Sequence, residues 1–271
     1  MLKLFLLLTT LNLMLFAYTD TDIDGVDDAT DRCPNTPFYE LVDSNGCSVS
    51  STISHHKFDF IYGISFAQSD YIEDTTDIVS QTLQFDYYYK DFSLNLGTSY
   101  SISKSPSYND NTLNDSYISA SYQFVPTKNL KIKTGIGLIL PTYDSELNNN
   151  NMDYTATLSA SYALEDMNVF MGYNFTQMND DDVVNTDITA LYQNTNSYSA
   201  GLGFYPSQDT YLSTSYLLSD NIYVGGESVR TMSIYLYSTL KQNWFSTFNY
   251  AYGLSDSASD NYLSFKIGYN F

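Results

Sequence analysis

The stretch NYLSFKIGYNF, residues 261–271, alternates between apolar and polar side chains along its whole length. Its apolar positions are Leu263, Phe265, Ile267, Tyr269 and Phe271. Successive side chains of a β-strand point to opposite faces, so a period of two predicts a strand with one apolar and one polar face.

The same alternation recurs along most of the chain. It defines about twelve segments, near residues 57–67, 79–90, 92–103, 115–124, 130–140, 153–164, 167–177, 196–205, 210–219, 229–240, 243–254 and 262–271. Tyrosine is also unusually common, with 27 residues beside 16 phenylalanines, and this composition suits strands rather than helices. The sequence therefore predicts an all-β fold.

The connections between these segments are of two kinds, and the two kinds alternate. The tight ones lie near Lys90–Asp91, Val125–Asn129, Glu165–Asp166, Pro206–Asp209 and Lys241–Asn243. The others are longer and rich in Asn, Asp and Ser. An up-and-down antiparallel transmembrane β-barrel has this rhythm, with short periplasmic turns and long outer loops. We predict such a barrel of about 12 strands over residues 51–271, although ten or fourteen strands stay open because Asp187–Gln193 could also pair.

Strand length and the last residue agree with a cell outer membrane location. Tilted strands of roughly 9–12 residues can cross the hydrocarbon layer, and a closed barrel leaves no strand edge exposed to lipid. Terminal Phe271 resembles the C-terminal assembly signal of outer-membrane barrels, which implies recognition by the barrel-assembly machinery. The other expected partners are outer-membrane lipid and lipopolysaccharide. A soluble, secreted β-sandwich also explains the alternation, but neither the rhythm of connections nor the terminal phenylalanine.

Composition and the first residues bear on location and partners. Acidic residues outnumber basic ones by 31 to 11, giving a net charge of −20, which argues against nucleic acid as a partner. Residues 1–17, MLKLFLLLTTLNLMLFA, place one lysine before an apolar stretch that closes on Ala17. This is typical of a secretory signal peptide and somewhat short for a transmembrane helix. An uncleaved N-terminal anchor is the alternative.

The chain has two cysteines, Cys33 and Cys47, in one small segment. In a secreted chain such a pair most simply forms one disulfide. Closing a loop of about 15 residues would stabilise the segment by roughly 3 kcal/mol. Free thiols are the alternative.

The stretch DTDIDGVDDATDRCP, residues 20–34, packs carboxylates around a single glycine, Gly25. Ca²⁺ takes six to eight oxygen ligands at about 2.3–2.6 Å, and a glycine permits the sharp turn that folds a loop around the ion. The candidate ligands are Asp20, Asp22, Asp24, the backbone carbonyl of Val26, Asp28 and Asp31. A solvated acidic linker is the alternative.

This acidic pattern resembles the thrombospondin type 3 repeat. Its continuation CPNTPFYELVDSNGC resembles the version found in outer-membrane proteins of the OmpA superfamily. The resemblance implies that the aspartates named above bind Ca²⁺ in a segment covering residues 18–50, on the periplasmic side of the barrel. It spans residues 20–47, amounts to barely one repeat, and is not followed by the pattern of a peptidoglycan-binding domain.

The polar faces of the predicted strands carry many small residues and a few charges. Charges on a lipid-facing surface are costly, so we assign them to the lumen. The pore-lining candidates are Asp59, Asp86, Lys90, Lys131, Lys133 and Lys266. They predict a modest pore for small solutes, with acidic outer loops that concentrate cations at its mouth. Ion pairs that brace a closed barrel are one alternative, and a structural anchor with a periplasmic envelope partner is another.

An enzyme is not expected. Nucleophilic catalysis commonly needs a positioned base, and the two histidines, His55 and His56, both precede the first predicted strand. The chain has neither Cys/His zinc spacing nor a nucleotide-binding fingerprint.

Overall fold

The computed structural model describes residues 20–22, 26–28, 30–34, 36, 42–47, 56–70, 75–106, 109–143, 151–184 and 189–271. The chain divides into two compact units, Met1–His55 and His56–Phe271, which are considered separately. The predicted signal peptide, residues 1–17, lies outside the described residues.

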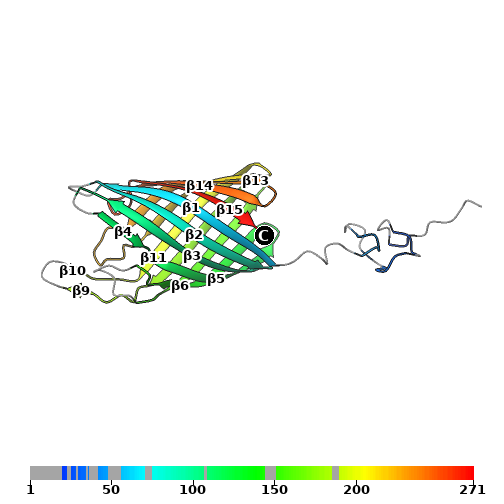
Figure 1. Ribbon diagram of the computed structural model, residues 1–271, viewed down its shortest axis with the longest axis horizontal. Coiled ribbons are helices and arrows are strands. Elements are labelled where there is room, and N and C mark those ends of the chain that lie inside the picture. Colours follow the sequence, from blue (N-terminus) through cyan, green and yellow to red (C-terminus); the bar gives the residue numbers. More distant parts are fainter. Residues whose placement is uncertain are drawn as a thin grey trace, which may run out of the picture. The chain divides into compact units, whose positions relative to one another are not determined.

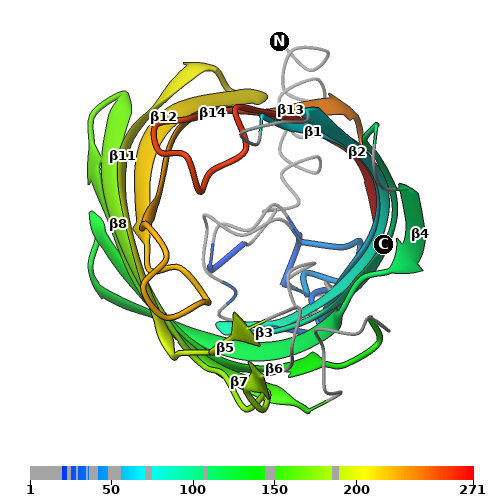
Figure 2. The same ribbon diagram turned by 90° about the vertical axis from the view of Figure 1, so that its left-hand side faces the viewer.

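The second unit is a closed antiparallel barrel of 12 strands (Figures 1 and 2). These are β1 (His56–Asp70), β2 (Thr75–Tyr89), β3 (Phe92–Lys104), β5 (Ser116–Thr127), β6 (Leu130–Leu140), β7 (Asp153–Leu164), β8 (Met167–Gln177), β11 (Thr195–Ser207), β12 (Thr210–Ser219), β13 (Val229–Lys241), β14 (Trp244–Gly253) and β15 (Asn261–Asn270). Each strand pairs with its neighbours in this order, and β1 pairs with β15 to close the barrel. The predicted fold class is confirmed.

Three short strands add to the barrel strands. β4 (Asn109–Leu113) pairs with the far end of β3, so that β4 and β5 together follow β3 along its length. β9 (Val183–Val184) and β10 (Thr189–Ala190) form a separate two-stranded sheet. Pairing within Asp187–Gln193, left open by the sequence, therefore occurs at Thr189 and Ala190 without adding a barrel strand.

The apolar face of every barrel strand points outward. Among the described residues only Ile61, Ala190 and Ala258 are buried hydrophobic side chains, whereas Ile136 is 70% exposed and Phe265 is 53% exposed. A soluble sandwich would bury this face in a core, so a continuous exposed apolar surface is what a lipid-facing barrel requires. The sandwich alternative is wrong.

Aromatic side chains gather near the tight-turn end of the barrel. The rings of Tyr122 and Phe124 lie 4.8 Å apart, and Trp244 and Tyr269 lie 5.0 Å apart. Tyr269 in turn lies 4.7 Å from Phe271. Rings with an apolar body suit the boundary between hydrocarbon and water.

The tight turns use left-handed backbone where the strand twist demands it. Lys90, in the turn between β2 and β3, has φ 52°, and Gln242, between β13 and β14, has φ 38°. Positive φ in a two-residue hairpin matches the right-handed twist of the flanking strands. The five tight connections predicted from the sequence are all turns of this barrel end.

Among the residues described above, no helix has the length and hydrophobicity needed to cross a membrane.

The first unit is held by a disulfide between Cys33 and Cys47, with an S–S distance of 2.00 Å and Cα atoms 4.9 Å apart. The predicted pairing is confirmed. The hydroxyl of Thr36 lies 2.9 Å from the carbonyl oxygen of Cys33 and 2.8 Å from that of Gly46, and Arg32 N donates to Asn45 O at 2.8 Å. These bonds tie the two sides of the disulfide loop together.

Candidate functional site

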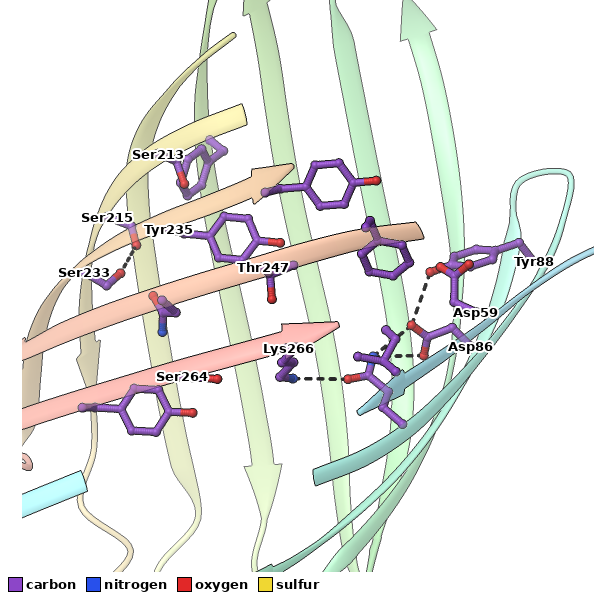
Figure 3. Close-up of a pocket in the computed structure, with 17 residues that line it drawn as sticks. Asp59, Asp86, Tyr88, Ser213, Ser215, Ser233, Tyr235, Thr247, Ser264 and Lys266 are labelled. Atoms are coloured by element: carbon purple, nitrogen blue, oxygen red, sulfur yellow. Dashed lines mark hydrogen bonds between the residues drawn. The ribbon is translucent and has the colours of Figure 1, made fainter. Parts of the chain in front are cut away.

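The inner face of the barrel encloses a cavity of about 640 Å³ (Figure 3). Its lining comes from β1, β2, β8 and the strands β12–β15. Because side chains alternate along a strand, these are the residues between the lipid-facing apolar positions. Two parts of the cavity lining differ in how their side chains are hydrogen-bonded.

The first part, called the braced wall here, comes from strands on both sides of the β1–β15 closure. Five of its members line the cavity: Asp59, Gln84, Asp86, Tyr88 and Lys266. Two more, Asn95 and Asn270, are included because they donate hydrogen bonds to Asp86 and Asp59. Asn270 Nδ2 donates to Asp59 Oδ1 at 2.6 Å, which links the last strand to the first. Lys266 Nζ donates to Gln84 Oε1 at 3.4 Å, which links the last strand to the second.

Asp86 is the centre of the braced wall and is only 3% exposed. Its carboxylate accepts from Asn95 Nδ2 at 2.8 Å, from Gln84 Nε2 at 2.9 Å and from the Tyr88 hydroxyl at 3.4 Å. Three neutral hydrogen-bond donors, rather than a cation, thus contact the Asp86 carboxylate. Hydrogen bonds to a charged group are stronger than those between neutral groups, which is how a carboxylate stays buried without an ion pair.

The second part, called the open wall here, consists of Tyr235, Tyr237, Thr247, Asn249 and Tyr262, from β13, β14 and β15. Their side chains make no hydrogen bond to any other residue in the described part of the chain, although all five are hydrogen-bonding groups that line the cavity. Figure 3 shows Tyr235 and Thr247 among them. The open wall therefore presents free donors and acceptors, together with three aromatic rings.

Two inward glycines allow rings to lie flat along the inner surface. Gly268 pairs across the sheet with Phe245, and Gly97 pairs with Tyr117. A Cβ atom at either glycine would collide with the ring of its partner. The glycines therefore let these two rings lie close against the inner surface of the barrel, where Phe245 lines the cavity.

The lumen on the side of β5–β7 is lined by smaller groups. A second cavity of about 210 Å³ is lined there by residues that include Asn95, Ser121, Lys133, Thr157 and Ser159. Lys131 has the same inward parity as Lys133 on β6. No ring crosses this region among its lining residues.

The lumen charges are not cancelled by direct ion pairs. Over the described residues, the one ion pair is between Arg230 and Glu227, at 2.6 Å and near the loop end of the barrel. Asp59, Asp86, Lys133 and Lys266 line cavities without one. Hydrogen bonds that involve amide and hydroxyl groups do join the barrel strands. The alternative of a closed barrel braced by ion pairs required direct ion pairs instead.

The predicted pore-lining residues thus fall into two groups. Asp59, Asp86, Lys133 and Lys266 line cavities in the lumen, and Lys131 shares their face. Lys90 does not: it is exposed in the turn between β2 and β3, with Nζ 5.6 Å from the ring of Tyr89. The sequence-based strand, residues 79–90, ends one residue too late and so includes Lys90. Lys90 was included because it continues a run of polar and aromatic residues.

Sequence reasoning missed the neutral members of both walls. The tyrosine content served only as an indication of strands, yet Tyr88, Tyr235, Tyr237 and Tyr262 face the lumen. A signal was present in SVRTMSIYLYSTL, residues 228–240, where Ile234 and Leu236 alternate with Tyr235 and Tyr237 and both faces are large. Strict parity, counted from the lipid-facing residues, would have placed these two tyrosines inside.

The loop end of the barrel forms an acidic vestibule. A cavity of about 1090 Å³ there is lined by residues that include Asp220, Tyr223, Glu227 and Asp256. Asn196 Nδ2 and Asn196 N both donate to Asp220 at 2.9 Å, and these bonds lower the pKa of the Asp220 carboxyl. Asp220 therefore stays ionised at neutral pH.

Two loops of the vestibule are joined to each other. Tyr192 and Tyr223 form a β-bridge, their rings lie 5.4 Å apart, and Gln193 N donates to Ile222 O at 2.9 Å. Burial raises the pKa of Tyr192 to about 12, so its hydroxyl is neutral. The bridge holds the loops beside β11 and β12 in one arrangement at the mouth.

A second group of carboxylates lies at the same end. Burial, followed by the nearby charge of Asp153, raises the pKa of Asp180. Asp115 adds to this effect. Over the part of the chain that the structure describes, no three acidic, histidine or cysteine side chains are arranged to hold a metal ion.

The predicted calcium ligands form bonds within their own segment. Thr21 donates its backbone N–H and its hydroxyl to Asp28, at 2.9 and 2.7 Å, and this lowers the pKa of the Asp28 carboxyl. Asp31 Oδ1 accepts from Cys33 N at 2.8 Å, and Asp22 Oδ2 accepts from Thr36 N at 2.7 Å. Asp24 lies outside the described residues. An all-oxygen donor set matches calcium, but the described ligands do not converge, so calcium binding stays a prediction.

Of the two histidines, His55 lies outside the described residues. His56 begins β1, and its Nδ1 is 2.7 Å from the hydroxyl of Tyr87.

Comparison with known proteins places the fold. No family model matches the chain, and no curated protein sequence matches it. An outer membrane channel from Pseudomonas putida F1 superposes with a TM-score of 0.68 at 8% identity, covering 81% of this chain and 97% of the channel. The KdgM porin, solved with oligogalacturonate, gives 0.54 at 11% identity over 79% of this chain and 99% of the porin. The NanC porin gives 0.53 at 12% identity over 79% and 98%.

At these identities the likeness concerns the fold. The closed barrel, its exposed apolar surface and these structural neighbours indicate an outer-membrane β-barrel. Within that class the fold is the one that outer-membrane channels and porins use.

Proposed function

We propose that this chain is a modest pore for small solutes in the outer membrane, with its long loops outside the cell. The observation that carries the proposal is the lumen cavity, which is lined by free polar groups and by charges without ion-pair partners among the described residues. A barrel that served only as an anchor would be expected to cancel such groups, because buried polar groups without partners are costly. The structural neighbours, which are channels and porins, support the same function.

The acidic vestibule supports cation preference. Asp220 and Asp256 lie at the mouth, beside Glu227, which is paired with Arg230, and the chain as a whole carries a charge of −20. Negative charge at an opening raises the local concentration of cations and lowers that of anions. The expected pore therefore favours small cations and neutral solutes over anions.

The test is the ionic current through the refolded barrel in a planar bilayer under a salt gradient. Closure of the barrel is checked beforehand by heat-modifiable gel mobility. Discrete current steps with a cation-selective reversal potential are expected. A correctly folded, inserted barrel that carries no current at any voltage would refute the pore and favour a non-conducting anchor.

We further propose that residues 18–50 bind Ca²⁺ on the periplasmic side through the carboxylates of Asp20, Asp22, Asp24, Asp28 and Asp31 and the carbonyl of Val26. Support comes from the thrombospondin type 3-like spacing and from the disulfide that ties the segment together. Extracellular modules bind Ca²⁺ with dissociation constants of about 10⁻⁴–10⁻³ M.

Calorimetric titration of the whole refolded protein with CaCl₂ tests this proposal. The expected result is a saturable heat that is lost in Asp22→Asn/Asp24→Asn. The Asp180→Asn/Asp181→Asn variant is the matched control, since it removes the same charge elsewhere. Equal heats from all three proteins would refute the site.

We propose no enzymatic role, since the structural neighbours named above are channels and porins.

A further inference from the structure

The open wall carries aromatic surface into a lumen that the proposed pore would fill with water. Tyr237 and Phe245 stack with their centroids 5.5 Å apart, and Tyr211 and Tyr235 meet edge to face at 6.5 Å. Exposing apolar area to water costs about 25 cal/mol per Å². A pore that passed only ions would gain nothing from such rings, so they favour a solute with an apolar face.

The same wall also carries hydrogen-bonding capacity that the protein leaves unused. The hydroxyls of Tyr235, Tyr237 and Tyr262 make no hydrogen bond to another described residue, and neither do the side chains of Thr247 and Asn249. A hydroxyl both donates and accepts, and an amide offers two donors and an acceptor. A solute that matches this wall must therefore donate and accept several hydrogen bonds around an apolar face.

The charges of the cavity argue against an acidic solute. Asp86 already accepts bonds from three side chains, and Asp59 accepts one from Asn270. Lys266 also lies in the cavity (Figure 3). The two carboxylates outnumber this single amine, so an acidic solute would be repelled.

We propose that the open wall is a binding site for neutral saccharides on their way through the lumen. The C–H face of a sugar ring would stack on Tyr235 and Tyr237, and the sugar hydroxyls would bond to the phenol groups, Thr247 and Asn249. The cavity of about 640 Å³ lies within the range of about 300–1,000 Å³ typical of small-molecule sites. The inference rests on the proposed pore and names its solute class.

The experiment measures block of the single-channel current by three probes: maltotriose, cellotriose and trigalacturonate. The two neutral trisaccharides are expected to interrupt the current, and the anion is not. In Tyr235→Leu/Tyr237→Leu the half-blocking concentration should rise about tenfold, since two ring faces are lost. Tyr235→Phe/Tyr237→Phe keeps the rings and separates stacking from hydrogen bonding, with a smaller rise expected.

Tyr252→Leu is the matched control, because Tyr252 is 52% exposed on the lipid side of β14 and should leave the block unchanged. A conducting wild-type barrel that neither neutral trisaccharide blocks would overturn the inference while leaving the pore intact. Equal block in the wild type and the double leucine variant would overturn it too.

Calorimetry in detergent separates the two proposals. If the folded barrel carries no current, titration with the same neutral trisaccharides decides the inference alone. Heat that disappears in the double leucine variant supports the saccharide site and refutes only the pore. An absence of heat from the wild type overturns the saccharide site.

Discussion

The braced wall and the open wall lie in one lumen but serve different needs. The braced wall joins strands that are far apart in the sequence: Asn270 and Asp59 are 211 residues apart, and Lys266 and Gln84 are 182 apart. The open wall belongs to β13, β14 and β15, which are consecutive strands joined by the turn at residues 242–243 and the loop at residues 254–260. Two bonds of the braced wall thus join strands from the two ends of the barrel sequence.

This difference has an energetic reason. Closing a long loop costs more conformational entropy than forming a hairpin, and the first and last strands form the most distant pair. Side-chain bonds across β15, β1 and β2 help to offset that cost. Consecutive hairpins need less help, so the wall they form can keep its polar groups for solutes.

The largest expected effect is on stability, from Asp86→Ala. Gln84, Asn95 and Tyr88 would lose their shared acceptor, and unsatisfied donors cost about 1–3 kcal/mol in unfolding free energy. Thr247→Val, in the open wall, should change the unfolding free energy by less than about 0.5 kcal/mol. Denaturant unfolding in detergent, followed through the single tryptophan, Trp244, gives both values. Equal midpoints for the two variants would erase the distinction between the walls.

A smaller effect is expected from Gly268→Ala. The new Cβ would collide with the ring of Phe245, which would have to move further into the lumen, at a cost of about 1–3 kcal/mol for overpacking. The conductance should fall as well. Gly172→Ala is the matched control, because the nearest atom there is the small Ser199 hydroxyl at 2.8 Å, which can rotate away. An unchanged current in Gly268→Ala would mean that Phe245 does not border the conducting path.

The fold was predictable because barrel patterning is local. Each strand repeats the alternation seen in residues 261–271, and the bounds of β3, β6, β7 and β12 differ from the sequence-based ranges by at most one residue. The lumen charges followed from the same parity. The two walls could not be predicted in this way. The bond of Asp86 to Asn95 joins β2 to β3, the bond of Lys266 to Gln84 joins β15 to β2, and no single strand encodes these pairings.

The smallest effect on stability, with a clear effect on selectivity, is expected from Asp220→Asn/Asp256→Asn. Removing two charges from the vestibule should move the reversal potential toward that of an unselective pore, because the local cation excess falls. The unfolding free energy should stay within about 0.5 kcal/mol of the wild-type value. Asp166→Asn, in the turn between β7 and β8, removes charge at the opposite end and serves as control. A larger shift from Asp166→Asn would place the selectivity at the turn end instead.

The central claim is that the open wall borders a conducting path, and thiol modification of Thr247→Cys tests it most directly. The two native cysteines are joined in the disulfide, so the introduced thiol is the single free one. A membrane-impermeant cationic methanethiosulfonate, added during a single-channel recording, is expected to react and to lower the current in one irreversible step. Full current with an unreacted thiol, or a folded barrel without current, would contradict the account.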